Sequence, residues 1–101
     1  MAPVGGVNYL TLTLPVRGSG TTFSGSTEQV SALVDGIYYH VQGSNDLTNF
    51  TATVVEVTGA DATSIQSSLP TLSTGWFYRT FRSQNSVSVT PKTFLRAKIT
   101  E

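Results

Sequence analysis

Short runs of leucine, β-branched and aromatic residues, each ended by Gly, Pro, Asn or Asp, follow one another along most of the chain. In Val7–Leu14, leucines alternate with Tyr and Thr, the period of a strand with one buried face. Turn signals recur about every 8 to 12 residues, a spacing typical of β-sandwiches. The pattern predicts an all-β chain: a small β-sandwich of about seven strands, of the immunoglobulin or fibronectin type III kind or a related one.

The strands are expected where β-favouring residues cluster, and Pro15 should end the first of them. The segment Arg17–Thr27 is rich in Gly, Ser and Thr and suits a loop or an irregular edge strand around Phe23. Gly59–Leu69 has room for one helical turn, but Pro70 and the Ser/Thr content favour a long connection. The other expected strands are Val30–Val34, Tyr38–Gln42, Phe50–Thr58, Trp76–Ser83 and Thr93–Thr100.

Asp35-Gly36 between two apolar runs is a strong signal for a two-residue hairpin, because both central positions of such a turn need positive φ. Val30, Leu33 and Val34 also fit helical spacing, so a helix capped by Gly36 is the alternative. We favour strand, turn, strand. The hairpin then pairs Val34 with Ile37 and Ala32 with Tyr39.

A length of 101 residues suits one domain with one core, so residues 1–101 are expected to form a single sandwich. Cysteine is absent, which excludes disulfides and thiolate metal sites. Only 12% of the residues are charged and the formal net charge is zero. No basic cluster suits the phosphates of a nucleic acid, and no motif calls for a cofactor.

No catalytic set is apparent in the sequence. A Ser-His-Asp arrangement would need His40, the only histidine, and the chain has no Gly-x-Ser-x-Gly elbow. The carboxylates stand singly along the chain, so none suggests paired-carboxylate hydrolysis. Gly43–Asp46 is expected to be a turn satisfied by its own side chains, and Asp46 is a weak candidate ligand for Ca²⁺. We predict no catalytic residues and no complete metal site.

Aromatic side chains offer the main candidate for binding. Tyr38, Trp76 and Tyr78 would form a platform for a glycan if they were exposed in a row, whereas core packing is the common role of such rings. Alternation places Trp76 and Tyr78 on one face of their strand and Phe77, Arg79 and Phe81 on the other. Arg79 is expected to pack its stem on the rings of Phe77 and Phe81, and its guanidinium group is expected to reach a partner or a cation–π contact. The spacing from Leu72 to Tyr78 resembles that of the corner tyrosine of fibronectin-like sandwiches.

Four segments carry a resemblance to a known group of proteins: LTLTLPVRGSGTTFSG, VDGIYYHVQGSNDLTNF, GWFYRTFRS and FLRAKI. Over about Leu10–Ile99 the chain resembles β-rich modules at the C-terminal ends of large secreted proteins of Verrucomicrobia and Planctomycetes. In those modules a turn ending in Asp-Leu is followed by an aromatic residue, here Phe50 and often Trp in relatives. They close with an aromatic-Leu-Arg strand, here Phe94-Leu95-Arg96.

The resemblance implies the terminal module of an exported or surface protein, with the upstream domains of the parent chain as its partners and with no assigned activity. The start of the chain lacks the charged and apolar regions of a secretory signal, and no apolar run is long enough to cross a membrane. The chain is therefore expected either to be cytoplasmic or to be a piece of a larger exported protein. The resemblance favours an extracellular or cell-surface location and a structural or interaction role, with glycan binding as the alternative.

Overall fold

The computed structural model describes residues 2–18, 21–25, 27–46, 48–87 and 93–100. Within these ranges the chain forms nine strands and one helix. In chain order these are β1 (Ala2–Val4), β2 (Val7–Tyr9), β3 (Thr11–Arg17), β4 (Phe23–Ser24), β5 (Gln29–Ser31), β6 (Tyr38–Ser44), β7 (Val54–Val57), α1 (Gly59–Gln66), β8 (Trp76–Ser83) and β9 (Phe94–Thr100).

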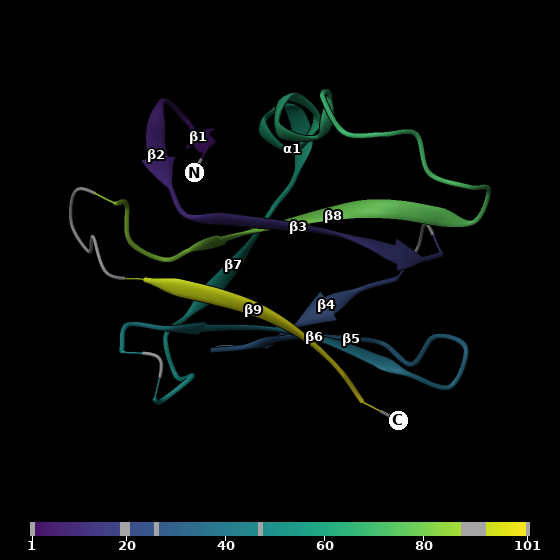
Figure 1. Cartoon of the computed structure of the whole chain (residues 1–101), viewed down its shortest axis with the longest axis horizontal. Helices are drawn as coiled ribbons and strands as arrows, with labels where there is room; N and C mark the ends of the chain where they lie inside the picture. The colour runs from purple at the N-terminus through teal and green to yellow at the C-terminus, as the bar shows by residue number, and fades with distance from the viewer. Residues whose placement is uncertain (1, 19–20, 26, 47, 88–92, 101) are drawn as a thin grey trace.

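Two antiparallel sheets pack face to face, and the predicted all-β sandwich is confirmed (Figure 1). One sheet has the order β3-β8-β7 and the other β4-β5-β6-β9, while β1 and β2 form a separate hairpin. Figure 1 shows α1 on the outer side of the β3-β8-β7 sheet. The strand order is not that of an immunoglobulin constant domain, in which the first two strands share a sheet, because β3 and β4, the first two strands of the sandwich, lie in different sheets.

The core lies between the two sheets. Phe81 and Val41 are fully buried at its centre, together with Val54. Phe23 meets Phe81 edge to face at 4.8 Å between ring centroids, an arrangement that aromatic pairs prefer. The alternation predicted for Leu12 and Leu14 is confirmed, because the pairing of β3 with β8 puts both on the face of Phe81 and against the core.

The prediction that Pro15 ends the first strand is wrong. β3 continues to Arg17 with Pro15 opposite Tyr78, and the strand instead breaks earlier, between β2 and β3 at Leu10. The physical reason is that β3 is the edge of its sheet. There a proline can point its nitrogen away from the neighbouring strand, so no ladder hydrogen bond is lost.

The hairpin at Asp35-Gly36 is confirmed. Both residues have positive φ, 50° and 81°, and Val34 bridges Ile37 as predicted. The pairing of Ala32 with Tyr39 is wrong, because β5 ends at Ser31 and its register is displaced by one residue from that of the Val34 bridge. The Ser31 hydroxyl accepts the Tyr39 N–H instead, at 2.8 Å.

The long connection expected over Gly59–Leu69 contains a two-turn helix, so that prediction is wrong. The helix follows the short strand β7, and the expected strand Phe50–Thr58 is reduced to Val54–Val57 and a bridge at Ala52. The sequence of α1 has weak helix propensity, but Ala62 is buried and Gln66 donates to the Thr80 hydroxyl at 2.8 Å. Tertiary packing therefore stabilises a helix that local sequence does not specify. Ser19, Gly20 and Ser26 of the expected Arg17–Thr27 loop lie outside the described residues.

Candidate binding groove

A groove opens where β7 stops short of β8. The last pair of their ladder is Val57 with Thr80, so β8 continues toward its start, Trp76, with no neighbour from β7. The hollow beside it has a volume of about 550 Å³, with α1 on one side and Thr21 and Thr22 on the other. A second hollow of about 360 Å³ adjoins it under the segment that follows α1. Phe77 lines both hollows.

Two aromatic rings stand at the mouth of this groove. Trp76 is 37% exposed and Phe77 is 43% exposed, although they lie on opposite faces of β8. Arg17 lies over the Trp76 ring at 5.7 Å and forms an exposed ion pair with Asp35 at 3.4 Å. The rings therefore offer flat apolar surface with a cation close by.

Tyr78 holds the wall of the groove in place. Its hydroxyl donates to the carbonyl oxygen of Pro70 at 2.5 Å, which ties the segment after α1 to the start of β8. A tyrosine early in a strand that bonds back to upstream backbone is the arrangement of a tyrosine corner, the resemblance suggested by the spacing from Leu72. Tyr78 is thus committed to the fold through its hydroxyl, while its ring still borders both hollows.

An ion pair forms the polar wall of the groove. Arg79 donates to Glu56 at 2.6 Å, and the two side chains are only 19% and 18% exposed. Arg79 also donates to the Thr21 carbonyl oxygen and lies over the Phe23 ring at 5.0 Å. The guanidinium group therefore makes a cation–π contact with Phe23, which is neither of the two rings expected from the sequence, and has Glu56 as its charged partner. The single positions of Arg and Glu in the sequence gave no sign of this pairing.

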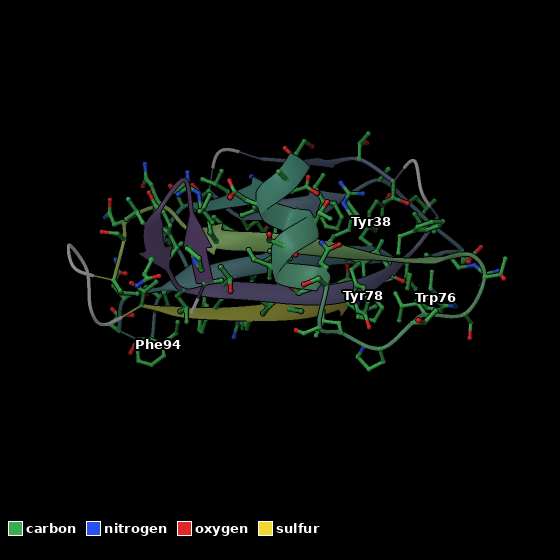
Figure 2. All side chains as sticks on the ribbon, turned by 90° about the horizontal axis from the view of Figure 1, so that it is seen from above. Tyr38, Trp76, Tyr78 and Phe94 are labelled. Atoms are coloured by element: carbon green, nitrogen blue, oxygen red, sulfur yellow. The ribbon has the colours of Figure 1, made fainter. Side chains whose placement is uncertain are left out.

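The three residues proposed as a glycan platform are not brought into one row. Trp76 and Tyr78 lie two residues apart on β8, but Tyr38 begins β6 in the other sheet. Figure 2 labels all three toward the same end of the molecule, with Phe94 at the far end. Tyr38 pairs with Thr100 on the outer face of its own sheet. Sequence alternation finds residues that share a strand, but not which strands share a sheet.

His40 takes part in a chain of contacts on that outer face. One ring nitrogen is 2.8 Å from the Thr100 hydroxyl and the other is 3.4 Å from Glu28. The order of hydroxyl, imidazole and carboxylate matches that of a catalytic triad. The hydroxyl, however, belongs to Thr100, a residue of β9 on the outer face of the sheet. These groups line none of the three hollows described for this chain. Glu28 is also held by Gln42, which donates to it at 2.7 Å.

Asp46 is held by its own turn. Its carboxylate accepts hydrogen bonds from the Ser44 hydroxyl and from the backbone N–H groups of Thr48 and Asn49, each at 2.9 Å. The N–H groups of Asn49 and Thr48, and then the Ser44 hydroxyl, lower the pKa of Asp46 from its ordinary value. Leu47 lies outside the described residues. Among those that are described, no three or more His, Asp or Glu side chains gather where they could hold a metal ion.

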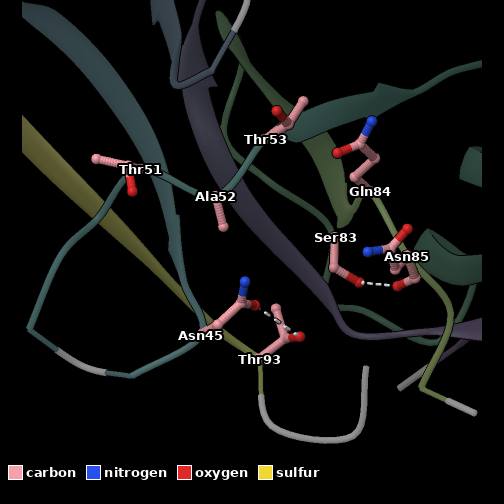
Figure 3. A pocket seen from close by; sticks show the side chains of 8 residues that line it. All are labelled: Asn45, Thr51, Ala52, Thr53, Ser83, Gln84, Asn85 and Thr93. Carbon is pink, nitrogen blue, oxygen red and sulfur yellow. Dashed lines mark hydrogen bonds between the residues drawn. The ribbon is translucent and has the colours of Figure 1, made fainter. Parts of the chain in front are cut away.

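A smaller pocket of about 190 Å³ lies at the far end of the sandwich and was not foreseen from the sequence (Figure 3). Amide and hydroxyl side chains line it, and it contains no charged residue. Thr93 donates to Asn45 at 3.4 Å, and Ser83 donates to the Asn85 carbonyl oxygen at 2.8 Å (Figure 3). Its lining comes from four separate segments whose Ser, Thr, Asn and Gln residues are too common to signal a site.

Comparison with protein-family models, with curated proteins and with solved structures finds no significant match. In the described ranges, no helix has the length and apolar character needed to cross a membrane.

Proposed function

We propose that the chain is a non-catalytic interaction module of a secreted or cell-surface bacterial protein. The observation that carries the proposal is the pair of exposed rings, Trp76 and Phe77, at the mouth of the groove beside β8. Exposed aromatic surface next to a hollow is typical of binding sites. The resemblance to terminal modules of secreted proteins supports the location, and the upstream domains of the parent chain are the proposed partners.

The hydrogen bonds of the ionisable side chains support a role without catalysis. Glu56 is held by Arg79, Glu28 by Gln42, and Asp46 by its own turn. A general acid or base needs a protonatable atom facing a substrate within a hollow. Glu56 borders the groove but is engaged by its ion pair with Arg79, and Glu28 and Asp46 do not line the three hollows described for this chain.

Carbohydrate is the second candidate ligand, and the composition of the groove favours it. Sugars present flat apolar faces edged by hydroxyl groups, which suit a tryptophan ring beside amide, hydroxyl and charged groups. Trp76 supplies the ring, while Gln66, Thr63 and the Arg79–Glu56 pair border the adjoining hollows.

Hydroxyl-radical footprinting with mass spectrometry tests the interaction module. We expect oxidation of Trp76 and Phe77 to fall when the chain is joined to its parent protein, because the rings become covered. Phe94 is the matched control, since it has the same exposure as Trp76, 37%, at the opposite end of the molecule (Figure 2). Unchanged oxidation at Trp76 and Phe77 would contradict the proposal.

A glycan array tests the second candidate. Binding that is reproducible in the wild type, is lost in Trp76→Ala and is kept in Phe94→Ala would establish a glycan site at the groove. Trp76 is the only tryptophan, so its fluorescence reports binding at this position without labelling. Absence of binding on the array would contradict carbohydrate as the ligand. An equal loss of binding in both folded variants would contradict a glycan site at the groove.

A further inference from the structure

Among the described strands that border the two sandwich sheets, β9 has the longest edge that no proline interrupts. β4 has two residues, β7 has four, and β3 carries Pro15, whose nitrogen has no hydrogen. Short strands and prolines are devices that keep sheet edges from pairing with other chains. β9 has seven residues without Pro or Gly, and it runs along one long margin of the molecule (Figure 2). Within the described residues it pairs with β6 alone.

Apolar side chains on the core-facing side of β9 are left uncovered. Ile99 lies opposite the buried Tyr39, yet it is 60% exposed, more than any other large hydrophobic side chain among the described residues. Leu95, on the same face, packs against the core. The core-facing side of β9 is therefore covered near Leu95 and becomes exposed toward Ile99. A further strand beside β9 would place its own inward side chains next to Ala97 and Ile99.

The other face of β9 carries positive charge. Arg96 and Lys98 alternate with the apolar residues and both are exposed. If two copies of β9 paired antiparallel to continue the sheet, every register that overlaps most of the strand would set a cation of one copy opposite a cation of the other. Like charges directly opposite destabilise a strand pair, whereas opposite charges stabilise it. The edge is therefore unsuited to self-pairing and suited to an acidic strand.

We infer that β9 binds an extended segment of another protein, in which apolar residues alternate with Asp or Glu, by addition of a strand to the sheet. Backbone hydrogen bonds would supply affinity, and the alternating side chains would supply specificity. The inference rests on the proposed interaction function but names a second surface, in the other sheet from Trp76. The two can therefore fail separately.

Fluorescence anisotropy with labelled synthetic peptides tests the inference. The probe is a short peptide of alternating Val and Glu, and the matched control has Lys in place of Glu. A third peptide carries Pro at its centre, which removes a ladder hydrogen bond. We expect the acidic peptide to bind, and the basic peptide and the proline peptide to bind far more weakly.

The protein variant is Lys98→Glu, because Arg96 also donates to Gln42 and lies over Phe50, so its replacement would disturb the fold. Reversing one charge opposite an acidic residue is expected to weaken binding about tenfold. Arg17→Glu, an equal change of charge in the other sheet, should leave peptide binding unchanged. Trp76→Ala should leave it unchanged too, and circular dichroism checks that each variant is folded.

Equal binding of the acidic and basic peptides would overturn the inference, as would tight binding of the proline peptide or an unchanged affinity in folded Lys98→Glu. Sedimentation velocity of the chain alone should show a monomer. A dimer that Lys98→Glu strengthens or abolishes would show that a second copy occupies this edge, and would overturn the inference as well.

Discussion

Arginine serves in this chain mainly as a packing residue. Each guanidinium group lies over an aromatic ring: Arg17 over Trp76 at 5.7 Å, Arg79 over Phe23 at 5.0 Å, Arg82 over Tyr9 at 4.4 Å and Arg96 over Phe50 at 3.5 Å. Such contacts contribute about 0.5 to 1 kcal/mol at exposed sites and more where water is excluded. They let a chain with few charges use its cations to cover apolar surface.

Replacement of Glu56 tests the semi-buried ion pair. Glu56→Ala removes the acceptor of Arg79 and leaves the guanidinium group largely out of water, so we expect the free energy of unfolding to fall by about 2 kcal/mol. Urea denaturation measures the change. Asp35→Asn removes the charge of the exposed pair with Arg17 while keeping a residue that accepts the positive φ of this position, and it is the control, with an expected cost between 0 and about 1 kcal/mol. Equal costs for the two variants would contradict the role of burial.

The turn at Asp46 makes stability depend on acid pH. The pKa of Asp46 is lower in the folded chain than in the unfolded chain, so its ionised form stabilises the fold above the unfolded value. This contribution is lost as pH falls through the folded pKa. We expect Asp46→Asn to melt at a lower temperature than wild type at neutral pH, with the difference shrinking in acid. Melting curves that stay equally separated at every pH would show that the ionised carboxylate does not act in this way.

At the scale of elements, sequence pattern specified the strands that have strong local signals. Trp76–Ser83 was predicted with the observed bounds, and the Asp35-Gly36 hairpin follows from two adjacent residues that accept positive φ. The helix α1 was missed because its stability comes from contacts with β8, which local propensity does not contain. Tyr38 was wrongly grouped with Trp76 for the same reason, since sheet membership depends on long-range pairing.

Two of the motifs that carry the resemblance meet in the fold. Phe50, the aromatic residue after the Asp46 turn, stacks under Arg96 of the closing strand at 3.5 Å. Arg96 also donates to Gln42 of β6, the strand beside β9, at 2.6 Å. The separate motifs thus form one contact that fastens β9 to β6, a relation that the sequence alone could not reveal because the two residues are far apart in it.

The hairpin geometry predicts that replacement of Gly36 lowers the free energy of unfolding. Gly36 has φ 81°, which valine adopts only with strain, so Gly36→Val should destabilise the fold by about 1 to 3 kcal/mol. Space does not confound the result, because a Cβ atom at this position would meet no heavy atom within 4 Å. Chemical denaturation gives the cost, and cross-strand contacts between Val34 and Ile37 in solution show the hairpin itself. Helical contacts from Val30 to Val34 would instead favour the capped helix.

At the scale of the whole molecule, the two sheets are joined by more than the apolar core. Val54 of β7 donates its N–H to Thr27 at 2.9 Å, and its carbonyl oxygen accepts from Gln29 at 3.0 Å. Arg79 reaches from β8 to the Thr21 carbonyl oxygen, just before β4. Hydrogen bonds between the sheets, added to a shared core around Phe81, favour a single unfolding unit.

Each sheet contains a natural reporter of that unfolding. Trp76, the only tryptophan, lies in the β3-β8-β7 sheet, and His40, the only histidine, lies in the other. We expect tryptophan fluorescence and the imidazole proton signals to give the same thermal midpoint. Val41→Ala, a change in the sheet of His40, should remove about 2 kcal/mol of stability through the cavity it leaves.

Because Val41 packs against Val54 and Phe81 across the core, the loss should appear equally at both reporters. For a domain of this size, about 2 kcal/mol corresponds to a shift of about 8 to 16 °C in the midpoint. Phe94→Ala, at an exposed aromatic position, is the control and should shift neither midpoint by more than a few degrees. If the His40 signal moved and the Trp76 signal did not, the sheets would unfold independently. The core would then be two weakly joined halves, and the interaction surface at Trp76 could not depend on the sheet that contains β9.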